Sequence, residues 1–219
     1  MNREQLALLN EVLVGCGKRK KELTGFIDHL YRADCIRDDE DGNLIFLVLN
    51  NVHGKLGYFQ PGKSFLSEKI GEFRNLTQLS VNDNKLSGCI PSAIGELLFC
   101  TRLDLSKNNL RGEIPQSIGN MRELQKLELH ENELVGAVPN SLENLSKLTH
   151  LDLSCNQLSD LNVDMSRLTS LRHLQLSHNC LIYLPDLGPL VRLEYLDVSY
   201  NQLEFRIPDY LSQLQDLKW

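Results

Sequence analysis

Apolar residues in the second half of the chain follow one repeating pattern. The first clear unit reads Leu76-Thr-Gln-Leu79-Ser-Val81-Asn-Asp-Asn84-Lys-Leu86. Corresponding units begin at Cys100, Leu124, Leu148, Leu171 and Leu193, and the asparagine recurs at positions 84, 108, 132, 156, 179 and 201. Six matches at so regular a spacing indicate a repeat array in which every unit forms the same supersecondary element.

Each unit predicts a short strand followed by a turn. Alternate leucines of the strand point to one side and the residues between them to the other. A single unit cannot bury its leucines alone, so stability arises from interfaces between neighbouring units. Each buried leucine contributes about 1.5–3 kcal/mol. The asparagine amides are expected to bond backbone groups that would otherwise be buried and unpaired.

The residues after each strand resemble a known family. The segments 87–91, 112–115 and 136–139 resemble the G-x-I-P signature of plant-type leucine-rich repeats, and 92–97 and 116–121 resemble their short convex-side helix. The resemblance extends from Leu76 to Trp219 but weakens near the end, where Asp160 and Phe205 replace the glycine. It implies a receptor-like or polygalacturonase-inhibitor-like protein. The implied fold is an α/β solenoid, a curved horseshoe with a parallel sheet on its concave face and short 3-10 or α helices on its convex face.

The remaining residues define the ends of the array. Helical spacing of apolar residues before and after a Gly15-Cys-Gly17 break predicts a helical N-terminal cap over 1–43. Residues 44–75 read as a degenerate first repeat with an inserted loop, and 76–216 hold the six clear repeats. Residues 217–219 begin a truncated seventh repeat, whose uncapped apolar edge predicts possible self-association.

Composition and charge narrow the function. A net charge of -6 argues against nucleic acid as the main partner, and no apolar stretch is long enough to insert into a membrane. The N-terminus lacks a secretion signal, and six cysteines without close pairs predict reduced thiols, as does the absence of the family's usual C-x-W-x-G-V-x-C motif. We therefore expect a cytoplasmic protein, with an extracellular location as the alternative. The sequons at Asn75 and Asn144 matter only in a secreted protein.

The outward residues of the strands form two predicted columns. The third position of the units is basic or aromatic along much of the array, and the fifth is largely acidic. A further row was expected just after the strands, at His130, Glu131, Cys155, His178 and Tyr200. Arginine and aromatic residues commonly anchor protein interfaces. The predicted partner-binding residues on the concave face are Arg102, Lys126, Glu128, His130, His150, Asp152, His173, His178, Tyr195 and Tyr200.

Two chemical alternatives concern the same face. His150 and His173 are expected to stack, and Cys155 lies one repeat from His178, which could form a zinc site or a Cys–His nucleophile pair. An open, wet surface does not activate a thiol without a base and an orienting group. We therefore predict no catalysis, no metal and no cofactor. The predicted function is a scaffold that binds another protein or peptide, with an ectodomain fragment or an inhibitor of a secreted enzyme as alternatives.

Overall fold

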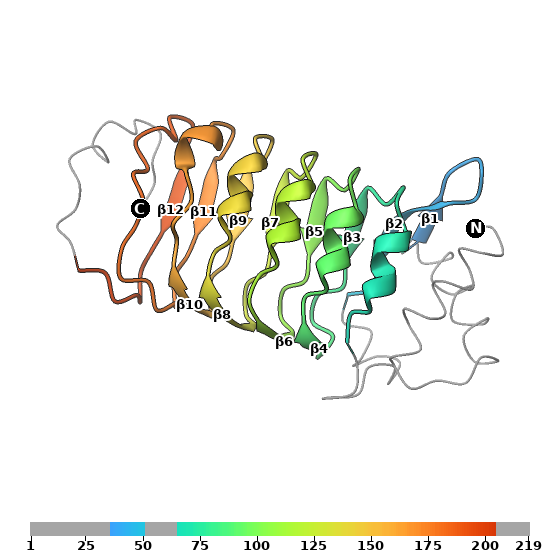
Figure 1. Cartoon of the computed structure of the whole chain (residues 1–219), viewed down its shortest axis with the longest axis horizontal. Coiled ribbons are helices and arrows are strands. Elements are labelled where there is room, and N and C mark those ends of the chain that lie inside the picture. The colour runs from blue at the N-terminus through green and yellow to red at the C-terminus, as the bar shows by residue number, and fades with distance from the viewer. Residues whose placement is uncertain (1–35, 51–64, 205–219) are drawn as a thin grey trace.

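A computed structural model of the chain describes residues 36–50 and 65–204. Its first sheet has eight strands in the order β1-β2-β3-β5-β7-β9-β11-β12. The strands follow one another along a curved solenoid (Figure 1). Their bounds are β1 Ile36–Asp38, β2 Leu44–Val48, β3 Gln78–Ser80, β5 Arg102–Asp104, β7 Lys126–Glu128, β9 His150–Asp152, β11 His173–Gln175 and β12 Tyr195–Asp197.

Parallel pairing from β2 to β12 places the central leucine of each strand beside that of the next. Leu79 pairs with Leu103, Leu103 with Leu127, and the register continues to Leu196 without a shift. These leucines are all buried, and they join one continuous apolar core that runs the length of the described array. The predicted leucine-rich solenoid with a parallel sheet is confirmed.

The recurrent asparagine joins each repeat to the one before it. Asn132 donates from Nδ2 to the carbonyl of Leu129 in its own repeat, at 3.0 Å, and to that of Leu105 in the preceding repeat, at 3.1 Å. Its Oδ1 accepts from the backbone N–H of Leu110 at 3.0 Å. Asn108, Asn156, Asn179 and Asn201 make equivalent bonds. The expected role of these amides is therefore observed.

A second sheet, which the sequence analysis did not anticipate, lies beside the first. It has the order β10-β8-β6-β4, with β4 Ser87–Cys89, β6 Asn109–Gly112, β8 Glu133–Ala137 and β10 Gln157–Asp160. Gly112 and Gly136 have φ of 73° and 79°, a backbone region that other residues rarely adopt. Where Asp160 replaces this glycine the register shifts, and no described strand extends the sheet further.

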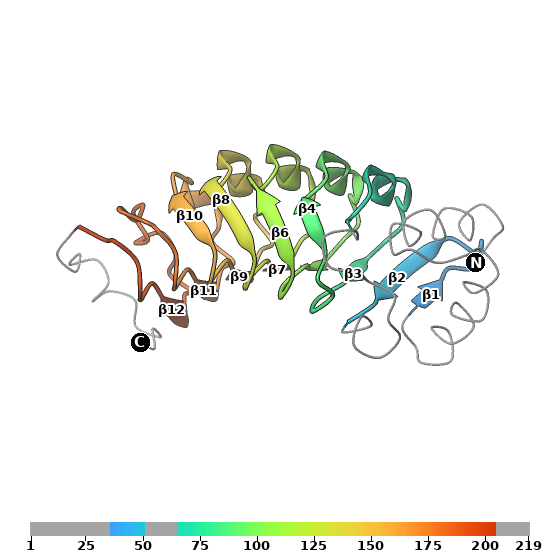
Figure 2. The same cartoon turned by 90° about the horizontal axis from the view of Figure 1, so that it is seen from below.

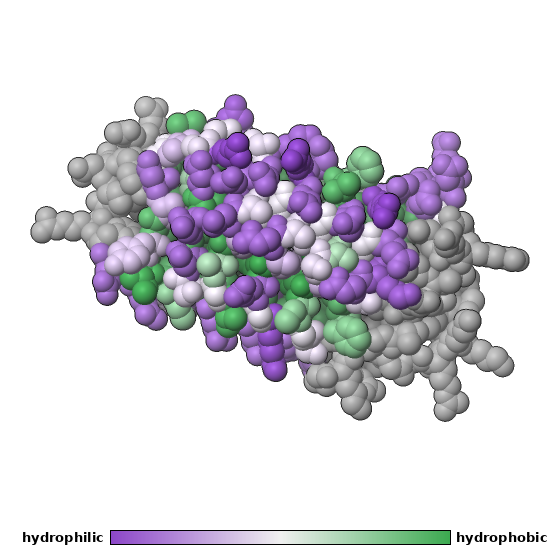
Figure 3. Space-filling view, in the orientation of Figure 1, coloured by the Kyte–Doolittle hydropathy of each residue, from purple (hydrophilic) through white to green (hydrophobic). Residues whose placement is uncertain are grey.

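Short 3-10 helices line the outer side of the solenoid, opposite the first sheet (Figure 2). Gly95 and Gly119 permit close stacking there, since a Cβ on either would lie 2.3 Å from the backbone oxygen of Ser117 or Ser141 in the next helix. The face that carries the helices is mainly hydrophilic (Figure 3). The helices are η1 Glu68–Glu72, η2 Ser92–Glu96, η3 Gln116–Asn120, η4 Asn140–Asn144 and η5 Met165–Arg167.

The predicted ends are described only in part. The strand β1, which pairs antiparallel with β2, occupies the end of the range expected to form a helical cap. The helices expected in the cap, most of the expected inserted loop and the expected C-terminal edge fall in residues 1–35, 51–64 and 205–219, outside the described residues. The domain boundaries and the self-association expected at the C-terminal edge therefore stay predictions.

Candidate functional site: the concave sheet face

The outward residues of the first sheet form two straight columns. Strand register places Arg102, Lys126, His150, His173 and Tyr195 next to one another in that order. The same pairings align the second column, Asp104, Glu128, Asp152, Gln175 and Asp197. Each column thus has the order that the sequence predicted, because the buried leucines fix which residues point outward.

Arg102 lies in an acidic environment. Its guanidinium donates from Nε to Oε2 of Glu128 at 3.0 Å, and Nη2 lies 2.7 Å from the same oxygen. Asp104, which is buried, lies 3.6 Å from Nη2. These carboxylates hold the guanidinium between the two columns, so that it is partly exposed but already paired. Lys126, in the next strand, has no ion-pair partner among the residues that the structure describes.

His130 and Asp152 form a half-buried ion pair across adjacent repeats. Nδ1 of His130 lies 3.1 Å from Oδ2 of Asp152, although the contact is not aligned as a hydrogen bond. The carboxylate raises the pKa of His130 against the opposing effect of burial. Burial works to raise the pKa of Asp152, but contacts with His130 and with Ser154, whose hydroxyl donates to Oδ1 at 2.6 Å, lower it overall.

Three aromatic rings follow one another along the third column, the first two of them stacked and the third tilted by 31°. The rings of His150 and His173 have centroids 4.3 Å apart and are inclined by 11°, and His173 and Tyr195 have centroids 6.2 Å apart. Burial, followed by the charges of Lys126 and His173, lowers the pKa of His150. The expected stacking of the two histidines is therefore observed. Together, Lys126, His150, His173 and Tyr195 form a surface that we call the concave strip.

The expected row after the strands needs one correction. Glu131, Cys155, His178 and Tyr200 do occupy one position, immediately before the repeat asparagine, and all have φ between 52° and 54°. His130 instead precedes that position, where the other repeats have mostly serine, and its side chain contacts Asp152. The rings of His178 and Tyr200 stack at 4.1 Å. The positive φ shared by this row was not indicated by the sequence pattern.

The metal and nucleophile alternatives gain nothing from the geometry. Within residues 36–50 and 65–204, no group of three His, Cys, Asp or Glu side chains could hold a metal ion. The exposed Cys155 has a raised pKa, because burial of the thiol and the carboxylates of Glu131 and Asp152 disfavour the thiolate. Cys89, Cys100, Cys155 and Cys180 are free thiols, as predicted for these four.

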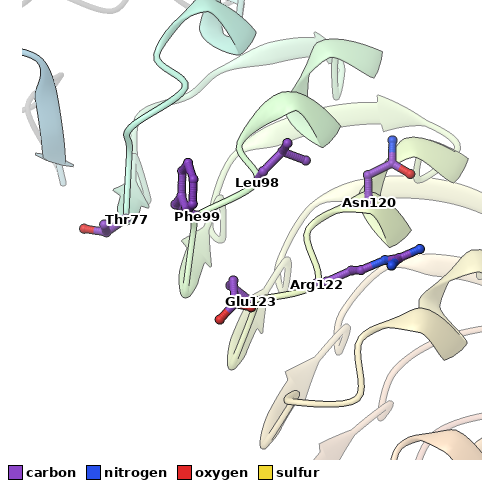
Figure 4. A pocket seen from close by; sticks show the side chains of 6 residues that line it. All are labelled: Thr77, Leu98, Phe99, Asn120, Arg122 and Glu123. Carbon is purple, nitrogen blue, oxygen red and sulfur yellow. The ribbon is translucent and has the colours of Figure 1, made fainter.

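Two surface hollows were not anticipated. A small one of about 120 Å³ lies at the N-terminal end of the concave face, where Phe46, Gln78 and Arg102 line it with three neighbours. A larger one of about 810 Å³ lies on the side of the solenoid, and Leu98 and Phe99 line it (Figure 4). The signal for the second was available in the sequence, since two apolar residues stand where the next two repeats have Arg122–Glu123 and Ser146–Lys147.

Comparison with known proteins identifies the class. Leucine-rich-repeat family models match residues 122–181 and residues 75–97, 100–121 and 192–214, more than half of the chain. The chain belongs to the leucine-rich-repeat family, and its solved relatives show it to be of the plant type. No curated protein matches the chain.

Solved structures of plant receptors resemble the chain. A plant peptide hormone receptor, RGFR1 in complex with RGF2, is 34% identical with a TM-score of 0.68 over 70% of this chain and 25% of that one. The ectodomain of the Arabidopsis receptor kinase HAESA, bound to an IDA peptide hormone, is 25% identical to this chain with a TM-score of 0.70. The match covers 98% of this chain and 40% of that one. A chain of the BIR3–SERK2 complex of Arabidopsis thaliana is 30% identical with a TM-score of 0.56, and the match covers 69% of this chain and 77% of that one. The chain thus spans well under half of the two peptide receptors.

Length and apolar character decide whether a helix can span a membrane. In the part of the chain that the structure describes, no helix has the length and apolar character needed to cross a bilayer.

Proposed function

We propose that this chain is a non-catalytic recognition scaffold that binds a peptide or a protein partner through the concave face of its first sheet. The observation that carries the proposal is the concave strip. Its four residues come from four successive strands, they point outward in register, and none of them is needed to pack the leucine core. Aromatic and cationic side chains of this kind supply much of the binding energy in protein interfaces.

The relatives support the choice of partner class. Two of the related structures are complexes of a peptide hormone receptor with its ligand, and the third is a complex of BIR3 with SERK2. We extend this to the present chain as a binding surface for a secreted peptide or for the ectodomain of a second receptor. The cytoplasmic location expected from the N-terminus finds no support among these relatives. They favour the extracellular alternative, which we adopt as part of the proposal.

The proposed site comprises the ten residues predicted from the sequence. The concave strip would supply the anchoring contacts, and the acidic column would orient a cationic or hydrogen-bonding group of the partner. Arg102 is held by Glu128, and Asp152 by His130 and Ser154, so these side chains lose little further conformational freedom on binding. His178 and Tyr200, in the row after the strands, would add contacts to the partner beside the two columns.

A binding screen tests the proposal. The purified chain is immobilised and probed with synthetic secreted peptides and with soluble receptor ectodomains. We expect a specific binder whose signal is lost when His173→Ala and Tyr195→Ala are combined. Arg111→Ala is the matched control, because this exposed residue lies on the second sheet and should leave binding unchanged. A binder that is insensitive to the concave variant but sensitive to Arg111→Ala would refute the proposed surface.

A further inference from the structure

The side hollow contains an apolar pair that no described neighbour covers. Leu98 is 51% exposed and Phe99 is 59% exposed, although both lie one or two residues before the buried Cys100. Thr77, Asn120, Arg122 and Glu123 complete the lining (Figure 4). Covering these two adjacent apolar side chains would be favourable.

The neighbouring repeat contains a possible occupant. Asn75-Leu76-Thr77 is an N-glycosylation sequon, and Asn75 is exposed. Its position corresponds to that of Phe99 one repeat later, because β3 and β5 pair with Gln78 beside Arg102. The backbone N–H of Thr101 donates to the carbonyl of Thr77 at 2.7 Å, which keeps the two chain segments side by side. Thr77 of the sequon also lines the hollow itself.

We propose that Asn75 is an N-glycosylation site whose innermost N-acetylglucosamine covers Leu98 and Phe99. The sugar ring presents axial C–H groups that pack against an aromatic face, and Arg122 and Glu123 supply polar groups at the rim of the hollow. Asn75 Nδ2 donates one hydrogen to Asp39 Oδ2 at 3.0 Å, and a glycan would replace one of the two amide hydrogens. The inference rests on the extracellular location in the proposed function.

The transfer step balances with one co-reactant, a polyprenyl-diphosphate-linked oligosaccharide. Nδ2 of Asn75 forms a bond to C1 of the first sugar, the bond between C1 and the diphosphate oxygen breaks, and the polyprenyl diphosphate leaves with that electron pair. The amide nitrogen releases one proton to the transferase. The transfer precedes folding during secretion, so the bond from the Thr77 hydroxyl to the carbonyl of Ile45 in the folded chain does not hinder it.

The second sequon, Asn144-Leu-Ser146, provides an internal comparison. Asn144 is exposed at the end of η4, and the hollow beside it is lined by Arg122, Lys147, Arg167 and other polar residues. A glycan on Asn144 would meet water and charged groups, without an exposed apolar pair. The effect of removing this glycan on Tm should therefore not depend on Leu98 and Phe99.

The experiment expresses the full chain in plant cells behind a secretion leader. Peptide mass spectrometry measures occupancy of both sequons, and thermal unfolding compares Asn75→Gln, the pair Leu98→Ser with Phe99→Ser, and all three changes together. We expect Asn75 to be occupied. We expect Asn75→Gln to lower Tm by about 2–4 °C, the size of shift that loss of one modest contact produces in a chain of this length. In the background without Leu98 and Phe99 this shift should shrink to the part that comes from the lost Asn75–Asp39 hydrogen bond, while Asn144→Gln behaves alike in both backgrounds.

Three results would overturn the proposal: an Asn75 without glycan while Asn144 has one, no glycan on either sequon, or a Tm shift of the same size with and without Leu98 and Phe99. The forced secretion removes the question of natural location from the first two. Partner binding by Asn75→Gln separates this proposal from the proposed function, because a glycan on the side of the solenoid can fail while the concave face still binds.

Discussion

The imidazole rings of His150 and His173 lie in parallel contact on neighbouring strands, with centroids 4.3 Å apart. The contact follows from repeat geometry, since equivalent residues of β9 and β11 are paired in register. Two imidazolium cations at this separation would repel one another, and burial also disfavours the charged form of His150. The centre of the proposed surface is therefore aromatic, and the lowered pKa of His150 favours its neutral form, with Lys126 at one end of the strip.

The first prediction concerns the order in which two histidines titrate. The pKa of His130 is raised by the Asp152 carboxylate, whereas the pKa of His150 is lowered by burial and by Lys126. In an NMR titration of the histidine C2 protons, His130 should therefore have the higher midpoint. Equal midpoints, or the reverse order, would show that the His130–Asp152 pair does not form in solution.

The second prediction concerns stability against pH. Because the folded-state pKa of His130 is raised, its contact with Asp152 stabilises the folded chain fully below the unfolded-state pKa of about 6.5. This stabilisation is lost as pH rises through the folded-state pKa of His130. A lowered pKa means that Asp152 stabilises above about 3.9 and loses this as pH falls through its folded value. Asp152→Asn should therefore cost more unfolding free energy in urea at pH 5.5 than at pH 8.5.

Asp197→Asn is the control for that measurement. Asp197 also accepts from Ser199, at 2.7 Å from the hydroxyl, but no histidine nitrogen in the described residues lies within ion-pair distance of it, and the charge of His178 is a minor cause of its lowered pKa. The cost of its removal should therefore depend on pH less than that of Asp152→Asn. Identical pH dependence in Asp152→Asn and Asp197→Asn would contradict the role given to His130.

The third prediction concerns the asparagine ladder. Asn132→Ala removes four bonds to backbone groups of two repeats, and leaves those groups without these partners. We expect a loss of about 2–4 kcal/mol in the free energy of unfolding, because an unpaired buried polar group costs about 1–3 kcal/mol. Glu133→Ala, at the next residue, removes a surface ion pair to Arg111 and an exposed hydrogen bond from Asn109, and should cost less than about 1 kcal/mol. Chemical denaturation compares the two, and equal losses would contradict the assignment.

The fourth prediction concerns the stacking of the outer helices. A methyl group on Gly119 would lie 2.3 Å from the Ser141 backbone oxygen, so Gly119→Ala must push η3 and η4 apart. We expect a loss of about 1–3 kcal/mol, the usual cost of overpacking a close contact. Asn120→Ala, at an exposed position of the same helix, should be nearly neutral. A neutral Gly119→Ala in the same thermal unfolding experiment would mean that the helices pack more loosely.

The solenoid and the two outward columns could be predicted from the sequence for a definite physical reason. Leu79, Leu103 and their equivalents must be buried, and with a strand period of two this fixes the direction of every residue between them. The row through Tyr200 was only partly predictable, because its direction depends on a positive φ that no hydrophobic period encodes. The second sheet was missed because β6 and β8 depend on backbone pairing between glycine-containing segments rather than on alternating apolar residues.

Contacts between side chains of neighbouring repeats were harder to predict from the sequence. That His130 pairs with Asp152 requires both the register of β7 with β9 and the turn after β7, and an isolated histidine gives no sign of either. Leu98 and Phe99 were overlooked because they stand outside the repeat pattern that directed attention to the strands.

Site-specific photo-cross-linking tests the central claim most directly. A photoreactive amino acid is placed at Gln175, on the concave face in β11, and separately at Asn140, exposed at the start of η4 on the outer side. With the binder from the screen in solution, we expect a covalent product from position 175 and none from position 140. A product from position 140 alone would place the partner on the outer face and contradict the account.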